Sequence, residues 1–549
     1  MFRENKGFQL KLISGIAMMS SKLKEKLAKS WAGVFYEQVF SKIDEKPFAV
    51  LYCDDNGRPN IPVNILLSFE IIKNLKDYTD ADLLDQITYN LQIIHAIGGQ
   101  DAGDVSFSPS TLYEFRNRVY RYTMQNPDKE SLIFGQFTSL TDNFIKVAGI
   151  STKEQRMDST QIMTNIKLGG RLSLAYDVLE QAIETCPEDL LTESHKNLLD
   201  PKYRTNTLYH TKGNEARMQR LQEMINLGAE LLDIVESRSE ICEKRGIAIL
   251  RRFISEQAYF ESSKKTWIIK DNKDIAANSL QSAYDEDVTY RKKAGKGHVG
   301  LVANLSETCA KENPVQMIVD YTVEKNIKGD TEMLEERIDR IKERTGLTDL
   351  NIDGGYFAGS VEAHSRDIDV QMHYTNMTGS EPNSQKVPLT SFVISNHNRI
   401  EACPQGYAPI SCHFNNKNKV ILAYFSLDHC LKCPFRNACP VQVRKNNAVL
   451  RVDQSKLFTE EAREKVQDKD AREQAGRKRA AIEGTNSALK RAQGAGKLKV
   501  RGIVKARLVI GLKVIGRNFS QLVNFFNGNT RNKYTKKPNR PRKGVIAPI

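Results

Sequence analysis

Residues 314–355, PVQMIVDYTVEKNIKGDTEMLEERIDRIKERTGLTDLNIDGG, contain the pattern that decides the fold. The first segment is rich in apolar and β-branched residues, which favours a strand. Residues 330–346 have apolar side chains at helical spacing and a glycine at the end. The segment DLNIDGG follows at once and predicts another short strand. A strand, a helix and a strand in this order indicate a mixed α/β layer.

Further strands are predicted on both sides of this stretch. They are EQRMDSTQIMTN (residues 154–165), GHVGLVANLSE (297–307) and VQMHYTN (370–376). Residues 171–284 form a long polar block whose spacing predicts an inserted helical hairpin or bundle. Residues 20–125 and 459–526 also have helical patterns, and Thr79 is a good helix cap.

Positive charge is concentrated at the C-terminal end. The 549-residue chain has a net charge of +14, and from residue 472 onward it has 20 Lys and Arg against two acids. The remainder has 61 basic and 65 acidic residues. A basic end on a near-neutral body indicates a polyanionic partner, with nucleic acid the first candidate and a membrane surface the second. Residues 527–549 have the composition of a basic disordered tail.

No run of residues approaches the roughly 18 apolar positions of a membrane span. The N-terminus lacks the apolar core and cleavage site of a signal peptide. Nine unevenly spaced Cys in a chain of this size do not suit a secreted disulfide scaffold. We therefore expect a cytoplasmic protein with no membrane partner.

Five of the nine Cys lie between residues 403 and 439. The segment CLKCPFRNAC (430–439) has the spacing C-x2-C-x5-C, and three thiolates this close suit a tetrahedral Zn²⁺. The expected ligands are Cys403, Cys430, Cys433 and Cys439, with Cys412, His413 and His429 as alternatives to the first. Reduced thiols without a metal, or an iron–sulfur cluster, are the other interpretations.

The segment SPSTLYEFRNRVYRY (108–122) places three basic residues, Arg116, Arg118 and Arg121, beside aromatic residues. A helix of this kind could read DNA. The alternative is a solvated basic face on a packed helix.

Three acids are candidates for catalysis. Asp158 lies inside a predicted strand, Asp353 ends another, and Glu483 lies in the helical stretch RAAIEGTNSALK (479–490). Arg479, Glu483 and Lys490 share one face of that helix, which permits plain surface ion pairs. Alternatively, three carboxylates can bind Mg²⁺ ions that activate a hydroxyl and stabilise the leaving oxygen of a phosphodiester, while the basic residues hold phosphates.

These motifs resemble those of bacterial insertion-sequence transposases of the DDE type, in the superfamily with a Y-x2-R-x3-E-x6-K signature. Arg479, Glu483 and Lys490 fit the signature at every spacing, whereas Gly476 stands at the Tyr position. MDST and DGGYFAGS resemble the blocks around the first two catalytic acids, and CPQG...CLKCPFRNAC resembles a Cys-rich module of a subgroup. The resemblance extends over about residues 30–526.

The resemblance implies an α/β fold with an RNase H-like catalytic core (residues 150–170, 285–385 and 459–526). It also implies a helical N-terminal DNA-binding domain (1–130), the helical insertion (171–284), a Cys-rich module (395–450) and the basic tail (527–549). Asp158, Asp353 and Glu483 would bind Mg²⁺ or Mn²⁺, and Arg479 and Lys490 would contact DNA.

The implied activity is binding to the terminal inverted repeats of a mobile element, followed by Mg²⁺-dependent cleavage and strand transfer. The partners would be double-stranded DNA and further copies of the chain, in a nucleoid-associated homo-oligomer. A metal-dependent nuclease without strand transfer, and a non-catalytic DNA-binding descendant of a transposase, remain alternatives.

Overall fold

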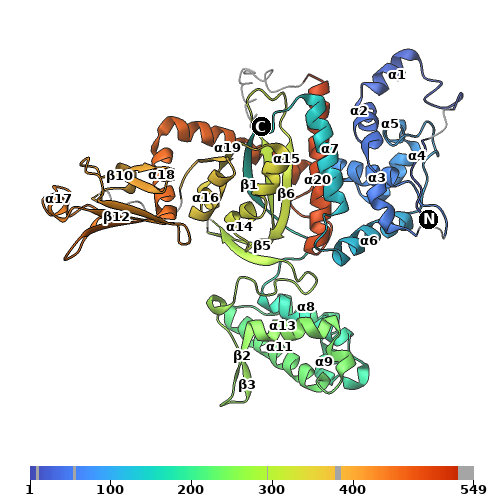
Figure 1. Cartoon of the computed structure of the whole chain (residues 1–549). Coiled ribbons are helices and arrows are strands. Elements are labelled where there is room, and N and C mark those ends of the chain that lie inside the picture. Colours follow the sequence, from blue (N-terminus) through green and yellow to red (C-terminus); the bar gives the residue numbers. More distant parts are fainter. Residues whose placement is uncertain (8–10, 54–56, 294, 378–384, 529–549) are drawn as a thin grey trace, which may run out of the picture.

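The computed structural model describes residues 1–528, except residues 8–10, 54–56, 294 and 378–384. A mixed β-sheet with helices on both faces lies at the centre (Figure 1). Helices from the N-terminal part of the chain lie on one side of this core, and a small antiparallel sheet lies on the other. A helical insertion projects below it.

The central sheet contains the strands that the sequence predicts. They are β1 (Glu154–Ile162), β5 (Lys296–Thr308), β6 (Ile318–Lys325), β7 (Asp349–Ile352) and β8 (Gln371–Tyr374), together with β4 (Thr289–Lys293). The order is β6-β5-β1-β7-β8, and β4 pairs with the first part of β5. β5 is antiparallel to both β1 and β6, whereas β7 is parallel to β1 and β8. The carboxyl ends of β1, β6, β7 and β8 therefore lie at the same edge of the sheet.

Helices cover both faces of this sheet. One face packs against α14 (Asp330–Glu335), α15 (Ile338–Thr345) and α16 (Gly359–Asp367). The other packs against α7 (Leu132–Ala148), α19 (Lys469–Ala492) and α20 (Ile503–Phe526). The single helix expected over 330–346 is two helices, separated by Glu336 and Arg337, and the guanidinium of Arg337 pairs with buried Asp320 of β6.

The N-terminal part is helical, as expected. Its main helices are α1 (Ser21–Ala28), α2 (Trp31–Gln38), α3 (Val63–Lys76), α4 (Asp80–Tyr89), α5 (Leu91–Ala96) and α6 (Pro109–Gln125). Thr79 caps α4 as predicted, but extended Asn90 ends this helix and caps α5. The hydrophobic core of these helices is continuous with α20, where the rings of Phe35 and Phe519 lie 5.1 Å apart.

The insertion has a hydrophobic core of its own, formed between Ala175 and Ala283. Its long helices are α8 (Arg171–Glu184), α11 (Asn214–Val235) and α13 (Arg245–Gln257). A hairpin of β2 (Ala258–Glu261) and β3 (Thr266–Ile269) projects from them, which the helical pattern did not predict.

The Cys-rich region contains β9 (Val393–Ser395), β10 (Arg399–Ala402), β11 (Ser411–Asn415), β12 (Val420–Phe425), β13 (Gln442–Val443) and β14 (Ala448–Asp453). The last four form an antiparallel sheet, β11-β12-β14-β13, and the short helix α17 (Leu427–Leu431) follows β12. Helix α18 (Gln454–Gln467) connects this region to α19. The basic tail was expected over residues 527–549. Its residues from 529 onward are not among those that the structure describes.

None of the helices in the described ranges is both long and apolar enough to cross a membrane.

Candidate active site

Asp158 and Asp353 lie at the same level of two neighbouring parallel strands. The register of β1 and β7 pairs Glu154 with Asp349 and Arg156 with Asn351. Two residues further along each strand are Asp158, on β1, and Asp353, which follows the last residue of β7. The side chain of Asp353 then accepts a hydrogen bond from the backbone N–H of Gly355, 2.9 Å away, which fixes the turn after the strand.

Helix α19 brings Arg479 and Glu483 to these two acids. Nη2 of Arg479 is 3.2 Å from Oδ1 of Asp158 and 3.4 Å from Oδ2 of Asp353, and Nη1 is 3.8 Å from Oε1 of Glu483. The three acids predicted from the sequence thus surround one guanidinium. Glu483 is the most open of them, since 65% of its side chain is exposed against 11% for Asp158.

A buried ion pair docks α19 on the sheet. Arg156 of β1 donates from Nε to Oε2 of Glu307 on β5, 2.8 Å away, and both side chains are almost fully buried. On the α19 side, Oγ1 of Thr485 donates to the other oxygen of Glu307 at 2.7 Å, and Nη1 of Arg156 donates to the carbonyl of Lys478 at 3.0 Å. These bonds fix where α19 lies on the sheet and how it is rotated about its own axis. They therefore also fix where its acidic and basic side chains lie.

Burial sets the proton affinity of Asp158. It raises the pKa of this carboxyl above its ordinary value, although the nearby charge and hydrogen bond of Arg479 act in the opposite direction. Nδ2 of Asn486 also donates to Oδ2 of Asp158 at 3.1 Å. Burial lowers the pKa of Lys490, and the charge of Asp158 partly offsets that effect. The site is therefore a partly dehydrated cluster of opposite charges.

The donor atoms at this site suit a hard divalent cation, because all are carboxylate oxygens. Arg479 now provides the positive charge between them. Across the described ranges, no three His, Cys, Asp or Glu side chains are grouped closely enough to hold a metal ion. A metal would therefore require Arg479 to withdraw from the acids.

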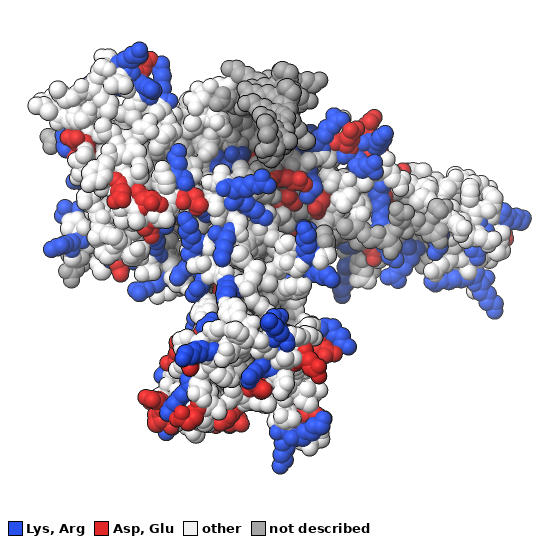
Figure 2. Space-filling model, turned by 180° about the vertical axis from the view of Figure 1, so that it is seen from behind, with Lys and Arg blue, Asp and Glu red and all other residues white. Residues whose placement is uncertain are grey.

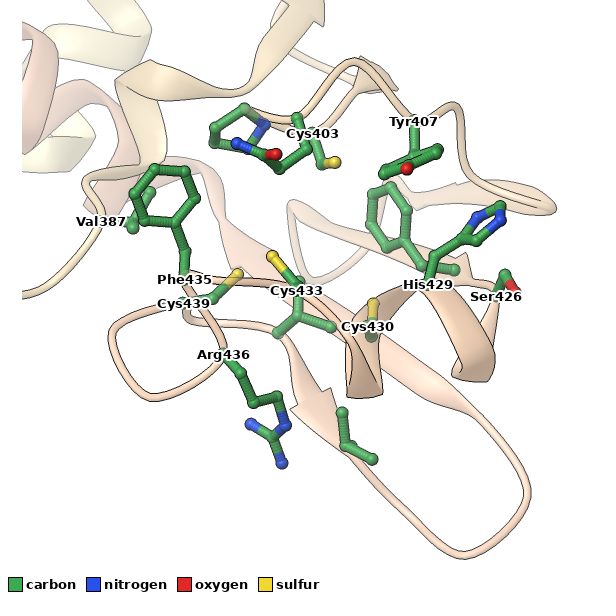
Figure 3. Close-up of a pocket in the computed structure, with 15 residues that line it drawn as sticks. Val387, Cys403, Tyr407, Ser426, His429, Cys430, Cys433, Phe435, Arg436 and Cys439 are labelled. Atoms are coloured by element: carbon green, nitrogen blue, oxygen red, sulfur yellow. The ribbon is translucent and has the colours of Figure 1, made fainter.

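A second cluster lies in the Cys-rich region. Cys403, Cys430, Cys433 and Cys439 line one small pocket of about 30 Å³, beside His429 and Arg436 (Figure 3). The backbone N–H of Gly406 donates to the carbonyl of Cys403, and that of Arg436 to the carbonyl of Cys433, so each of these cysteines begins a tight Cys-Pro turn. All nine cysteines are free of disulfides.

The residues that line the pocket distinguish between the alternative zinc ligands predicted from the sequence. Cys412 and His413 lie on β11 and do not line the pocket, and Sγ of Cys412 accepts a hydrogen bond from the N–H of Ile400. His429 lines the pocket, but its ring is stacked on Tyr407 with a centroid distance of 4.3 Å. Burial raises the pKa of Cys430, and the neighbouring thiols add to this effect. A bound cation would relieve that repulsion.

The three arginines of α6 have different surroundings. Arg116 donates hydrogen bonds to Glu70 and to Asp80, one to each at 2.6 Å. Its hydrogen bonding to Asp80 holds the pKa of that carboxyl well below its usual range. Its charge is thus used to hold α6 against α3 and α4. Arg118 and Arg121 are exposed, and Arg118 lies over the ring of Tyr52. These two are more accessible than Arg116, of whose side chain 28% is exposed.

The surface charge is uneven. On the face shown in Figure 2, Lys and Arg side chains gather over the middle of the molecule and at the tips of the two lateral parts. Acidic side chains form smaller groups between them. This pattern suits an extended polyanion better than a small acidic ligand.

The sequence pattern did not identify Asn486 and Thr485, although both contact the site. Asn486 lies seven residues after Arg479, which is two helical turns and therefore the same face. That spacing could have revealed it. Thr485 could not be identified in this way, because its partner Glu307 comes from a strand 178 residues away in the chain.

Two family models match the chain. A model described as a transposase DDE domain matches residues 402–523, which include the Cys-rich sheet, α19 and most of α20. A second, described as a transposase domain (DUF772), matches residues 23–118, which include most of the N-terminal helices. No curated protein and no solved structure matched the chain.

Proposed function

We propose that the chain is an insertion-sequence transposase that binds the inverted repeats at the ends of its own element. The two transposase family models that match it support this proposal. In this proposal the chain cuts the DNA there by divalent-metal-dependent hydrolysis and joins the freed 3′ ends to a target. The observation that carries the proposal is the convergence of Asp158, Asp353 and Glu483 on one guanidinium.

The central sheet supports an RNase H-like catalytic core. Its mixed order places two acids on adjacent parallel strands and the third on a helix that packs across them. Asp158, Asp353 and Glu483 would hold Mg²⁺ or Mn²⁺. Such ions polarise a phosphoryl oxygen, lower the pKa of an attacking water or hydroxyl, and stabilise the leaving oxygen.

Arg479 and Lys490 would hold the phosphates of the DNA. Arg479 can bind a phosphate through two parallel hydrogen bonds, whereas Lys490 acts as a point charge. Arg479 now neutralises the acids, and DNA binding would give its guanidinium a competing anion. The metal ion and the DNA phosphate would then bind together. The metal ion would replace Arg479 beside the acids, and the phosphate would replace the acids beside Arg479.

Other parts of the chain would bind DNA and maintain the assembly. Arg118 and Arg121 of α6 would contact the element ends, and the basic C-terminal segment would bind phosphates without reading sequence. The side chains of Cys403, Cys430, Cys433 and Cys439 line one pocket but are not grouped closely enough in the structure to hold an ion. They would have to turn toward one another to bind a structural Zn²⁺, for which four thiolates are a common ligand set. Recombination of two ends requires two active sites, so we propose a nucleoid-associated homo-oligomer on DNA.

The test uses DNA duplexes with the inverted repeats that flank the gene. Purified full-length protein should nick these ends in Mg²⁺ and join them to a target plasmid. Asp158→Asn, Asp353→Asn and Glu483→Gln should still bind the ends but lose cleavage, whereas Glu473→Gln, an exposed acid at the start of α19, should behave as the parent. Cleavage without joining would indicate a nuclease, and binding without either would indicate a non-catalytic descendant. Cleavage by any of the three site variants at the parent rate would remove that acid from the site.

A further inference from the structure

A large cavity lies between the N-terminal helices and α20 and is separate from the proposed active site. Helices α3 and α6 pack against α20 (Figure 1), and the cavity that they enclose with it has a volume of about 580 Å³. The three proposed catalytic acids do not line it, nor do Arg479 and Lys490. Most of its walls come from residues 23–118 and 402–523, so it lies where the two transposase domains meet.

The walls of this cavity carry more positive than negative charge. The charged residues that line it are five cations, Lys73, Arg116, Lys499, Lys505 and Lys513, and three acids, Glu70, Asp77 and Asp80. Arg116 pairs with both Glu70 and Asp80. Lys73 also pairs with Asp80, at 2.7 Å. Asp77 is thus the one acid of the lining that faces the other three lysines, and two positive charges are in excess.

Asp77 is a loose partner for two of these lysines. Its Oδ1 lies 3.6 Å from Nζ of Lys513 and 3.7 Å from Nζ of Lys499, and both distances are longer than a hydrogen bond. Asp77 ends α3 in a left-handed conformation with φ of 54°. Gly494 makes room for its carboxylate, since a Cβ there would lie 2.7 Å from both oxygens. Two ammonium groups therefore approach one carboxylate oxygen, one from α20 and one from the segment that precedes it.

Lys513 is a buried cation with spare hydrogen-bond donors. Only 5% of its side chain is exposed, and burial lowers its pKa to about 8. The charge of Lys499 lowers this pKa further, whereas that of Asp77 raises it. An ammonium group has three donors, and the carbonyl of Gln493 accepts one of them. An anion in the cavity would accept another and would stabilise the charged form of Lys513.

The rest of the lining suits a flat apolar group. It contains Tyr113, Phe115, Val119 and Tyr120 of α6, and Leu508, Val509 and Leu512 of α20. Tyr113 is half exposed, and Nζ of Lys505 lies 4.7 Å from the ring centroid of Tyr120. Aromatic side chains of this kind stack on nucleobases. The cavity thus combines an excess of cations with aromatic and apolar walls.

We propose that this cavity binds a nucleoside monophosphate, with the phosphate on Lys499 and Lys513 and the base against the side chains of α6 and α20. A phosphate monoester carries about −1.5 to −2 charges at neutral pH, which matches the excess positive charge of the lining. The ligand is a free nucleotide or the nucleotide at the 5′-phosphate end of a DNA strand. The second source rests on the proposed function, because hydrolysis that frees a 3′ hydroxyl leaves a 5′ phosphate on the other product.

The test measures binding to the full-length protein without metal, by calorimetry with dAMP, deoxyadenosine and inorganic phosphate. dAMP should bind about tenfold or more tightly than either of the others, because each of them lacks part of the contacts. Equal binding of dAMP and inorganic phosphate would reduce the cavity to an anion site and overturn the nucleotide assignment.

Variants of the lining assign the contacts. Lys499→Gln and Lys513→Met should each weaken dAMP binding by about tenfold or more, because each removes a charged hydrogen-bond donor to the phosphate. Tyr120→Ala should weaken the binding of dAMP but not that of inorganic phosphate. Lys497→Gln is the matched control, since this exposed lysine of the same segment does not line the cavity, and it should bind dAMP as the parent does. Lys499 is 59% exposed, so its variant keeps the test decisive if Lys513→Met fails to fold.

A short single-stranded oligonucleotide with either a 5′ phosphate or a 5′ hydroxyl separates the two sources by fluorescence anisotropy. Binding of dAMP alone would assign the cavity to free nucleotides. Tighter binding of the phosphorylated strand that is lost in Lys499→Gln would assign it to DNA ends. If neither ligand binds, or if Lys499→Gln and Lys513→Met bind both as the parent does, the inference is wrong. A parent protein that binds dAMP in this way but does not cleave the element ends would overturn the proposed function and support the cavity site.

Discussion

Arg479 lies between Asp158 and Asp353, with one guanidinium nitrogen 3.2 Å from an oxygen of the first and 3.4 Å from an oxygen of the second. The side chain that we propose as a phosphate ligand therefore forms ion pairs with the proposed metal ligands. A divalent cation and Arg479 compete for the same oxygens. Phosphate binding by Arg479 removes that competition, so we expect metal affinity and DNA affinity to be positively coupled.

Asp158→Asn is expected to stabilise the metal-free protein at neutral pH. The folded-state pKa of Asp158 is raised by burial, so the folded form binds more protons than the unfolded form between the two pKa values. Ionised Asp158 therefore lowers the free energy of unfolding above its folded pKa, and this penalty disappears as the pH falls through that value. Arg479 keeps Asp353 and Glu483 as partners in the variant.

Thermal melting between pH 4 and 8 without metal checks this expectation. The Tm difference between Asp158→Asn and the parent should be positive at neutral pH and should shrink in acid. Asp128→Asn, an exposed acid between α6 and α7, serves as the control and should show little difference at any pH. A destabilised Asp158→Asn at neutral pH would mean that Arg479 more than offsets the cost of burying the carboxylate.

Arg479 and Lys490 are expected to act on turnover rather than on stability. Arg479→Ala and Lys490→Ala should each reduce cleavage and joining by about tenfold or more, on the order of 1.4 kcal/mol in the barrier, with the melting temperature nearly unchanged. Arg479→Lys should recover activity only in part, because the forked guanidinium is lost. Single-turnover rates at saturating Mg²⁺ measure this effect, on intact ends for cleavage and on precut ends for joining. Arg477→Ala changes a residue of the same helix that pairs with exposed Glu473, and it should retain the parent rate. Equal rates in all variants would return Arg479 to a plain ion-pair role.

The acids of the strands could be predicted from local sequence, whereas their partners could not. Asp158 lies inside one predicted strand and Asp353 directly follows another, and β-pairing of those segments is enough to bring them side by side. The position of Glu483 also follows from the signature spacing, but its contact with the acids through Arg479 depends on how α19 docks. That docking uses Glu307, which looks like an ordinary strand residue in the sequence.

Contacts between elements that are distant in the sequence also explain the other differences between the predicted and the observed structure. Arg116 resembles its exposed neighbours in the sequence, but α6 packs so that Glu70 and Asp80 surround it. The hairpin of β2 and β3 was missed because it follows a long helical block and is only a few residues long.

Glu307 is expected to be needed for both folding and activity. Glu307→Ala leaves the buried guanidinium of Arg156 without its carboxylate and removes the acceptor of Thr485, which should cost about 3–5 kcal/mol in the free energy of unfolding. Cleavage should fall with it, since α19 loses its anchor. Urea unfolding measures the first effect. Lys29→Ala breaks an exposed pair with Glu25 and should leave the urea midpoint nearly unchanged, so a similarly small change for Glu307→Ala would refute the anchoring role.

The arginines of α6 are expected to separate into two classes. Arg118→Ala and Arg121→Ala should weaken binding to the element ends and flatten its salt dependence, by a slope of roughly 0.9 for each phosphate that the variant no longer neutralises. Arg116→Ala should instead lower the melting temperature, because it removes the cation that Glu70 and Asp80 share and leaves Asp80 with Lys73 alone. Fluorescence anisotropy over a salt series, together with thermal melting, measures both effects. If Arg116→Ala weakened DNA binding while Arg118→Ala and Arg121→Ala lowered the melting temperature, α6 would have to rearrange and present Arg116 to DNA.

The Cys pocket is expected to hold about one zinc ion per chain, bound by the four thiolates. Cys433→Ser should lose this zinc and lower the stability of the Cys-rich region, because a structural site contributes binding energy to folding. Cys412→Ser changes a thiol on the neighbouring strand β11 that does not line the pocket, and it should keep its zinc. Elemental analysis of protein purified without chelators, combined with thiol titration before and after denaturation, measures the occupancy. Zinc retained by Cys433→Ser but lost from Cys412→Ser would move the site to β11, and protein without zinc or iron would show that the cysteines are reduced structural thiols.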